Sequence, residues 1–308
     1  MAIKLSYLVK SSVLLGALLC GASARAQEAN VTAGRAEVYK QLQPGSLEAV
    51  STREQIKNLR ASNIPPTRIW KVLEHGEKLE CLDCIPIVSK LLYNAHPKTR
   101  EISAWWLRRR IFGVFGPGQV YAQTVGTLGD SSESESHRVY AANALGEFLS
   151  LSGVPALRSA ITQDASPLVR GAAVAALERL NSSGDGALAS ALSDQEESVK
   201  LAALHATTRI NAFTDAVAVV ALIGDSSALV RRRAAETLGV MRSEDAVAGL
   251  MVLGTEGEES DAAVRTAAIW ALGQIGDPSA RSVILEAQED TDASVRSAAK
   301  IAARMLRL

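Results

Sequence analysis

The sequence predicts an all-α solenoid of about seven helix-turn-helix repeats, preceded by an N-terminal helical cap. A 12-residue pattern returns along the chain at nearly constant spacing, and apolar residues within it follow a helical period. Aromatic residues make up only 4% of the 308 residues. Few aromatic residues together with much alanine and leucine favour closely packed helices over a β-sandwich.

The repeated pattern begins at residues 99, 137, 169, 199, 230, 264 and 295, and the copy from 169 reads VRGAAVAALERL. With the first residue as position 0, apolar or small residues fall at positions 0, 4, 7, 8 and 11, which share one face of a helix. A small residue at position 4 lets two helix backbones approach closely. The residues at this position are Ser103, Ala141, Ala173, Ala203, Ala234, Ala268 and Ala299.

A second, shorter apolar helix is expected between successive copies. The expected ranges are 154–161, 186–192, 216–223, 246–253 and 280–287. Turn residues such as Gly276-Asp277-Pro278 mark the breaks. One such unit cannot bury its own apolar face, so the units must stack into a curved solenoid.

Position 1 of the pattern is basic in every copy, and an acidic residue stands six residues earlier in five copies. The acid can accept hydrogen bonds from backbone N–H groups in its turn, or it can pair with the basic residue. One interpretation is a charged ligand track, and the other is a ladder that sets the repeat spacing. Because the pairing recurs from repeat to repeat, we favour a structural ladder made by Asp164, Arg170, Asp194, Lys200, Asp225, Arg231, Glu259, Arg265, Asp290 and Arg296.

The D-x5-R/K spacing, the V-R-x-x-A-A-x-A-L helix and the 31-residue period resemble the short HEAT-like repeats named for phycobilisome lyases, over residues 79–308. This resemblance implies a right-handed α-solenoid in which the second helix of each pair lines the concave side. It implies much less about function. The HEAT-like deoxyhypusine hydroxylases carry His-Glu pairs as iron ligands, and no histidine here is followed by glutamate.

Residues 1–26 have the form of a secretory signal peptide. Lys4 and Lys10 precede a short apolar run at 12–19, and Ala24-Arg25-Ala26 fits a small-x-small cleavage site. Cys20 leaves a lipoprotein signal open as an alternative. The apolar run is shorter than the roughly 20 residues of a membrane span. We therefore expect an exported chain, periplasmic or secreted, with no membrane insertion after cleavage.

Residues 27–78 do not fit the repeat and are expected to cap the open apolar face of the first repeat. Short helices are predicted within them at 36–43, 52–60 and 66–75. Cys81 and Cys84 follow as a CxxC pair, for which a structural disulfide is favoured over a thiol-redox role or a metal site. Ile85 stands where a haem attachment site requires histidine.

No catalytic constellation is recognisable, since the chain has no HExxH, GxSxG, GxGxxG or P-loop motif. The near-balanced charge gives no electrostatic footprint for nucleic acid. We expect no catalytic residue, cofactor or metal, and predict a non-catalytic scaffold that binds another protein on the concave face of the solenoid. The alternative is an accessory factor with lyase-like or thiol-redox activity through Cys81 and Cys84.

Candidate partner-binding residues come from positions 2, 6 and 9 of the pattern, which lie opposite its core positions. The residue at position 6 differs from copy to copy. Such variation is expected of a surface shaped for a ligand, and equally of a solvent-exposed face whose sequence is not constrained. The first copy holds Trp105-Trp106-Leu107-Arg108-Arg109-Arg110, and exposed tryptophan with arginine is typical of binding hot spots. Alternatively, the tryptophans pack under the cap. The predicted partner-binding residues are Trp105, Arg108, Arg109, His205 and Trp270.

Overall fold

The computed structural model describes residues 52–61, 63–111 and 118–307. Within these ranges the chain forms 16 α-helices and no strand. The predicted all-α solenoid is confirmed, and each of the seven copies of the pattern lies on its own α-helix. The signal peptide predicted at 1–26 and the helix predicted at 36–43 fall outside the described residues.

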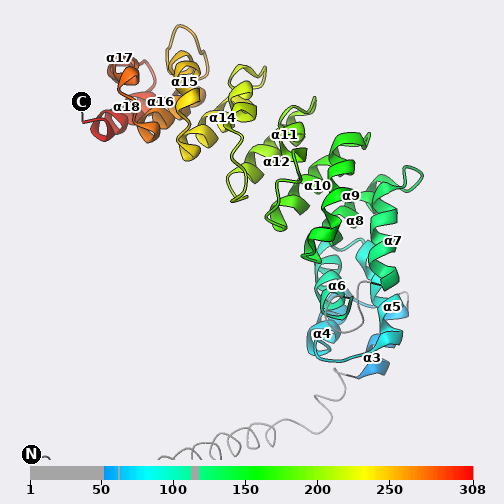
Figure 1. Ribbon diagram of the computed structural model, residues 1–308. Helices are drawn as coiled ribbons and strands as arrows, with labels where there is room; N and C mark the ends of the chain where they lie inside the picture. The colour runs from blue at the N-terminus through cyan, green and yellow to red at the C-terminus, as the bar shows by residue number, and fades with distance from the viewer. Residues whose placement is uncertain (1–51, 62, 112–117, 308) are drawn as a thin grey trace, which may run out of the picture.

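The helices form two rows that run the length of the molecule. The outer row comprises α3 (Arg53–Lys57), α5 (Ile85–Lys90), α7 (Gly118–Gly129), α9 (Val154–Gln163), α11 (Ala187–Leu192), α13 (Ala216–Val220), α15 (Val247–Leu253) and α17 (Arg281–Glu286). The inner row comprises α4 (Pro66–His75), α6 (Pro97–Arg109), α8 (Glu135–Glu147), α10 (Pro167–Arg179), α12 (Glu197–Thr207), α14 (Ala228–Met241), α16 (Ala262–Ile275) and α18 (Ala293–Met305). Figure 1 shows the stack bending into an arc, with the helices from α6 to α18 that carry the pattern along its inner side.

The inner helices begin and pack as the pattern predicts. Ser134, Ser166 and Ser227 cap α8, α10 and α14 with their hydroxyl oxygens, which accept hydrogen bonds from backbone N–H groups of the first turn. Asp261 and Asp292 do the same for α16 and α18 with a carboxylate oxygen. All seven residues at position 4 are fully buried. The 3.6-residue period therefore identified the packed face correctly.

Position 9 of the pattern departs from its predicted outward orientation. In three copies it is a buried glycine that meets the next inner helix. A Cβ atom on Gly146 would lie 3.0 Å from the Cα atom of Ala176, and one on Gly239 would lie 2.9 Å from the Cα atom of Ala271. Gly273 approaches Ala302 in the same way. The outward prediction fails here because neighbouring inner helices are close enough to cover this position.

The N-terminal part of the described chain adds one more helix pair to the stack. The helix predicted at 66–75 coincides with α4, and the one predicted at 52–60 forms α3 followed by a 3-10 turn at Asn58–Arg60. α4 packs against α6, and α3 packs against α4 and α5. The described residues between 52 and 78 therefore continue both rows next to the first repeat, although their sequence does not show the repeat pattern.

Candidate functional site

The concave face carries two grooves that differ in character. The N-terminal groove, of about 800 Å³, crosses α6, α8 and α10 and is lined by charged and polar side chains that include Arg100, Glu101, Asn143, Glu147 and Arg179. The C-terminal groove, of about 1460 Å³, crosses α12, α14, α16 and α18. Its lining includes Leu229, Arg232, Arg233, Val240, Trp270 and Ile301.

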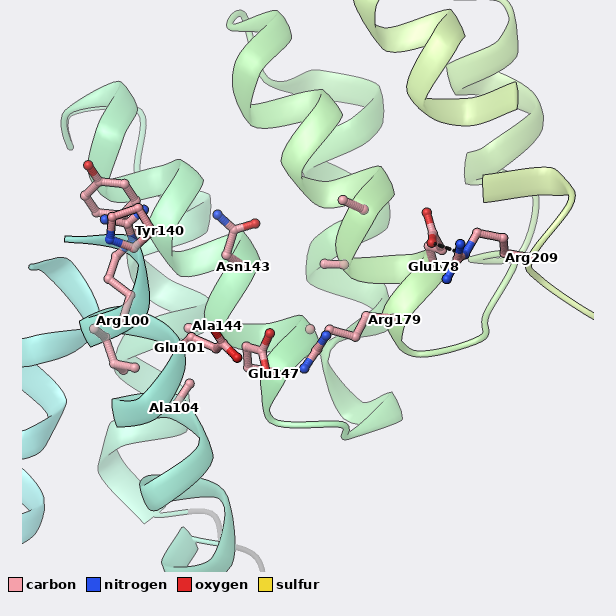
Figure 2. Close-up of a pocket in the computed structure, with 15 residues that line it drawn as sticks. Arg100, Glu101, Ala104, Tyr140, Asn143, Ala144, Glu147, Glu178, Arg179 and Arg209 are labelled. Carbon is pink, nitrogen blue, oxygen red and sulfur yellow. Dashed lines mark hydrogen bonds and ion pairs between the residues drawn. The ribbon is translucent and has the colours of Figure 1, made fainter. Parts of the chain in front are cut away.

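Charged side chains in the N-terminal groove pair with each other across neighbouring repeats (Figure 2). Arg179 Nη2 donates to Glu147 Oε2 at 2.6 Å, and Arg209 Nε lies 2.6 Å from Glu178 Oε1. The other oxygen of Glu178 lies 2.9 Å from His205 Nδ1. These ion pairs form a row that links neighbouring repeats along the groove.

Glu147 occupies the most enclosed position in this row. Burial raises the pKa of its carboxyl above the usual range, while the charge and hydrogen bond of Arg179 act in the opposite direction. Arg108 lies close enough to oppose the shift as well. At the entrance of the groove, the guanidinium of Arg100 stacks over the Tyr140 ring, 3.9 Å from its centroid.

The C-terminal groove presents mainly apolar surface. Leu229, Val240 and Ile301 are exposed within it, and Trp270 lies half-buried on α16. Its charged centre is small: Arg232 and Arg233 both face the one carboxylate of Glu236. Exposed apolar side chains gathered along a concave surface mark a place for a partner to dock.

The predicted acid–base ladder holds the repeats together through contacts between neighbours. Arg170 Nη1 donates to the backbone carbonyls of Asp164 and Ala165 in its own turn. Its Nε and Nη2 donate to the carboxylate of Asp194 in the following repeat, at 2.7 and 2.8 Å. Each carboxylate therefore pairs with the basic residue of the preceding repeat and not with its own. The five rungs are Arg138–Asp164, Arg170–Asp194, Lys200–Asp225, Arg231–Glu259 and Arg265–Asp290.

The acid of each rung also orders its own turn, as the sequence suggested. An oxygen of Asp290 accepts a hydrogen bond from the backbone N–H of Asp292 at 2.7 Å. Hydrogen bonds from the Arg265 guanidinium hold the pKa of Asp290 below its usual range, against the opposing effect of burial. Ladder side chains are largely shielded from solvent, which suits a structural role and leaves little charge for a ligand track.

The structure separates the five predicted partner-binding residues into two groups. His205 and Trp270 line the C-terminal groove. Trp105, predicted on the outer face, is half-buried against the core, and neither it nor Arg108 or Arg109 lines either of these two grooves. The three residues are therefore separated from the surface that the other two share.

Arg110 joins the first regular repeat to the residues that precede it, and it was not identified as a structural residue from the sequence. Its guanidinium is fully buried, stacks on the Trp106 ring and donates to the carbonyls of Gly76, Glu77, Leu79 and Trp106. Burial lowers its pKa to about 10, with the charge of Glu80 opposing the shift. The signal was present, because Arg110 occupies position 11 of the pattern, a core position.

Cys81 and Cys84 lie together at the start of the first regular repeat. Their Cα atoms are 5.3 Å apart, within the range that a disulfide spans, and their sulfur atoms are in contact. Both residues are buried, so a substrate thiol would not reach them without local opening. The disulfide itself stays a prediction, which alkylation of the native, unreduced protein would test.

In the described part of the chain, no three or more His, Cys, Asp or Glu side chains gather as a metal site would require. None of the helices described has the length and apolarity of a membrane span.

Comparison with known families identifies the repeat. Residues 127–207 and 216–304, more than half of the chain, match the sequence model of HEAT repeats. The chain belongs to the HEAT-repeat family. No curated protein sequence matches it. The family assignment therefore rests on the repeat itself, and it agrees with the resemblance read from the pattern.

Solved structures of other HEAT-repeat or solenoid proteins share the fold. The Escherichia coli protein YibA aligns with a TM-score of 0.54 at 15% identity, over 85% of this chain and 96% of that one. Kap95p, solved with RanGDP, aligns with a TM-score of 0.58 at 15% identity, over 86% of this chain and 39% of its own. The CpcE–CpcF phycocyanin lyase from Nostoc sp. PCC7120 aligns with a TM-score of 0.38 at 20% identity, over 72% and 94%. At these identities the likeness concerns the fold alone.

Proposed function

We propose that this HEAT-repeat protein is a non-catalytic scaffold of the periplasm or cell envelope that binds a partner protein on its concave face. The observation that carries this proposal is the pair of grooves along the inner helices, which are lined by side chains from Arg100 in α6 to Ile301 in α18. Side chains that build the repeat keep their type from copy to copy, whereas these inner-face side chains differ. A solenoid offers an extended concave surface for this kind of binding.

The fold comparison supports the class of ligand. Kap95p, whose fold is similar, binds the protein RanGDP. The predicted signal peptide supports the envelope location. The alternative role in thiol-redox chemistry has weaker support, because Cys81 and Cys84 are buried away from both grooves.

Affinity capture from an envelope extract tests the proposal, with the mature protein as bait. The concave double variant Asn143→Arg/Val240→Arg places a long charged side chain in each groove. The matched variant Val217→Arg/Val252→Arg changes two exposed valines on the outer helices α13 and α15. We expect the wild type and the outer variant to capture the same protein, and the concave variant to lose it.

Two outcomes would overturn the proposal. Capture that survives the concave variant but fails with the outer one would move the binding surface to the convex side. Failure of all three baits to retain any protein would remove the scaffold function. Circular dichroism of each bait ensures that a loss of capture reflects the surface and not unfolding.

A further inference from the structure

The C-terminal groove is large and apolar enough to bind a segment of a macromolecule. Its volume of about 1460 Å³ exceeds the roughly 300–1,000 Å³ of small-molecule pockets. Leu229, Val240 and Ile301 are 41%, 59% and 53% exposed along it. Trp270 lies between them on α16 and supplies an aromatic contact. Apolar surface of this extent favours a ligand that is itself apolar on one side.

The spacing of the inner helices matches the repeat of an α-helical ligand. Gly239 and Gly273 bring α14, α16 and α18 into backbone contact, so successive inner helices lie at the usual interaxial distance of about 8–10 Å. A ligand helix laid along the groove rises about 1.5 Å per residue, which puts side chains i and i+7 on one face about 10 Å apart. Each helical repeat of the groove can then receive one apolar side chain of the ligand.

The polar groups of the groove favour a helix over an extended segment. An extended ligand exposes backbone N–H and C=O groups that need partners once buried. Among the described residues that line the groove there is no asparagine or glutamine. The hydroxyls of Thr208, Thr266 and Ser297 already donate to backbone carbonyls of their own helices. A ligand helix satisfies its backbone internally and needs no such partners.

The charge at the centre of the groove favours an acidic side chain in the ligand. Glu236 Oε2 accepts from Arg233 Nη1 at 2.7 Å, and its Oε1 lies 3.4 Å from Arg232 Nε. Arg232 Nε is buried and makes no hydrogen bond. Asp292, at the groove edge, is occupied in capping α18. Arg232 and Arg233 therefore share one carboxylate at ion-pair distance, and a carboxylate of the partner would give this pair of guanidinium groups a second one.

We propose that the C-terminal groove binds an amphipathic α-helix of a partner protein. The apolar stripe of that helix packs on Leu229, Val240, Trp270 and Ile301, and one of its acidic side chains pairs with Arg232 and Arg233. This inference rests on the proposed scaffold function and adds the class of partner segment that one half of the face recognises.

Selection from a phage-displayed library of random 16-residue peptides, with the mature protein as target, tests this inference. We expect the selected peptides to carry apolar residues at i, i+3 or i+4, and i+7 together with an aspartate or glutamate, and to become helical on binding. Val240→Asp and Ile301→Asp should each weaken their binding at least about tenfold, the loss expected of a central apolar contact. Val217→Asp, on outer helix α13, should leave binding unchanged.

The acidic contact is tested with one selected peptide and its Glu→Gln form. Wild-type protein should bind the acidic peptide about tenfold more tightly. In Arg232→Gln/Arg233→Gln this preference should disappear, and in the control Arg281→Gln, on α17, it should persist. A preference that survives the double change would remove the charge contact from the proposal.

Other results would overturn the helix assignment while leaving the scaffold function intact. Selected peptides that alternate apolar and polar residues, or that are rich in proline, would show an extended ligand. A wild-type dimer that becomes monomeric with Val240→Asp would show that a second copy fills the groove. Failure to select any peptide, together with envelope capture that Asn143→Arg alone abolishes, would place the partner on the N-terminal groove instead.

Discussion

The two halves of the concave face are built alike and present different surfaces. Gly146 meets α10 in the N-terminal half as Gly239 meets α16 in the C-terminal half, and ladder rungs of the same geometry tie the repeats in both. The exposed side chains nevertheless form ion pairs in one half and an apolar groove in the other. The repeat thus fixes helix contacts and turns, and it leaves the inner surface free to vary with the ligand.

The largest effect on stability is expected in the N-terminal half, where Arg110 binds backbone carbonyls that precede the first regular repeat. Arg110→Met removes a buried guanidinium and leaves the carbonyls that it binds without donors, so we expect a loss of about 3–5 kcal/mol in unfolding free energy. Arg109→Met, at an exposed neighbour paired with Glu80 at 3.5 Å, should cost less than about 1 kcal/mol. Urea denaturation measures both. Equal effects of the two changes would mean that the first repeat is held by its helices alone.

The second expected effect tests whether the helix contacts of the two halves are equivalent. Gly146→Val and Gly239→Val each drive a side chain into the neighbouring inner helix, and both should cost about 2–3 kcal/mol in denaturant unfolding. Val240→Asp, one residue from Gly239 but exposed in the groove, should change stability by less than about 0.5 kcal/mol. The comparison breaks down if only one glycine proves sensitive, or if Val240→Asp destabilises as strongly.

A smaller effect is expected from the ladder, which both halves share. Asp290→Asn should lower the unfolding free energy by about 2 kcal/mol at pH 7, because the buried Arg265 guanidinium loses its paired charge. The pKa of Asp290 is depressed in the folded state, so its contribution is complete above the unfolded value near 4 and disappears as the pH falls through the folded value. The difference between wild type and variant should therefore shrink below about pH 4. If the stability difference between wild type and Asp290→Asn stayed constant down to pH 2, the loss would come from packing or hydrogen bonding and not from the charge of Asp290.

The smallest effect is expected from Glu147 in the N-terminal groove. Burial raises the pKa of Glu147 in the folded state, although the pair with Arg179 opposes this. The folded protein therefore loses stability as the pH rises from the unfolded pKa through the folded pKa and the carboxyl ionises. Glu147→Gln should therefore leave the protein as stable at pH 7, or more stable by on the order of 0.5 kcal/mol. Thermal melts at pH 4 and pH 7 would measure this. A loss above about 1 kcal/mol would give the concave ion pairs the structural role that belongs to the ladder.

The packed face of each repeat could be predicted from the sequence because burial follows from local periodicity. Ala234 and Leu238 are four residues apart on one helix, and the period alone puts them inside. The partner of each ladder carboxylate could not be predicted, since it depends on how one repeat is set upon the next. The spacing of Asp164 and Arg170 suggested a pair, whereas Asp164 binds Arg138.

The candidate site was predictable only in part, for the same reason. His205 and Trp270 were identified from the variation at position 6, and both line a groove. The exposed side chains of Val240 and Leu229 in that groove were missed, because neither stands at position 2, 6 or 9 of the pattern. For Trp105 the sequence left open whether the side chain binds a partner or packs under the cap; it is half-buried, as Trp270 is, but lines neither groove.

The central claim is that the concave face holds the partner, and site-specific photocrosslinking tests it most directly. A benzoylphenylalanine residue placed at position 240 in the C-terminal groove, at 143 in the N-terminal groove or at 217 on the outer row would be irradiated in intact cells. We expect a crosslinked partner protein from one or both groove positions and none from position 217. Crosslinking from position 217 alone would contradict the account and assign binding to the convex side.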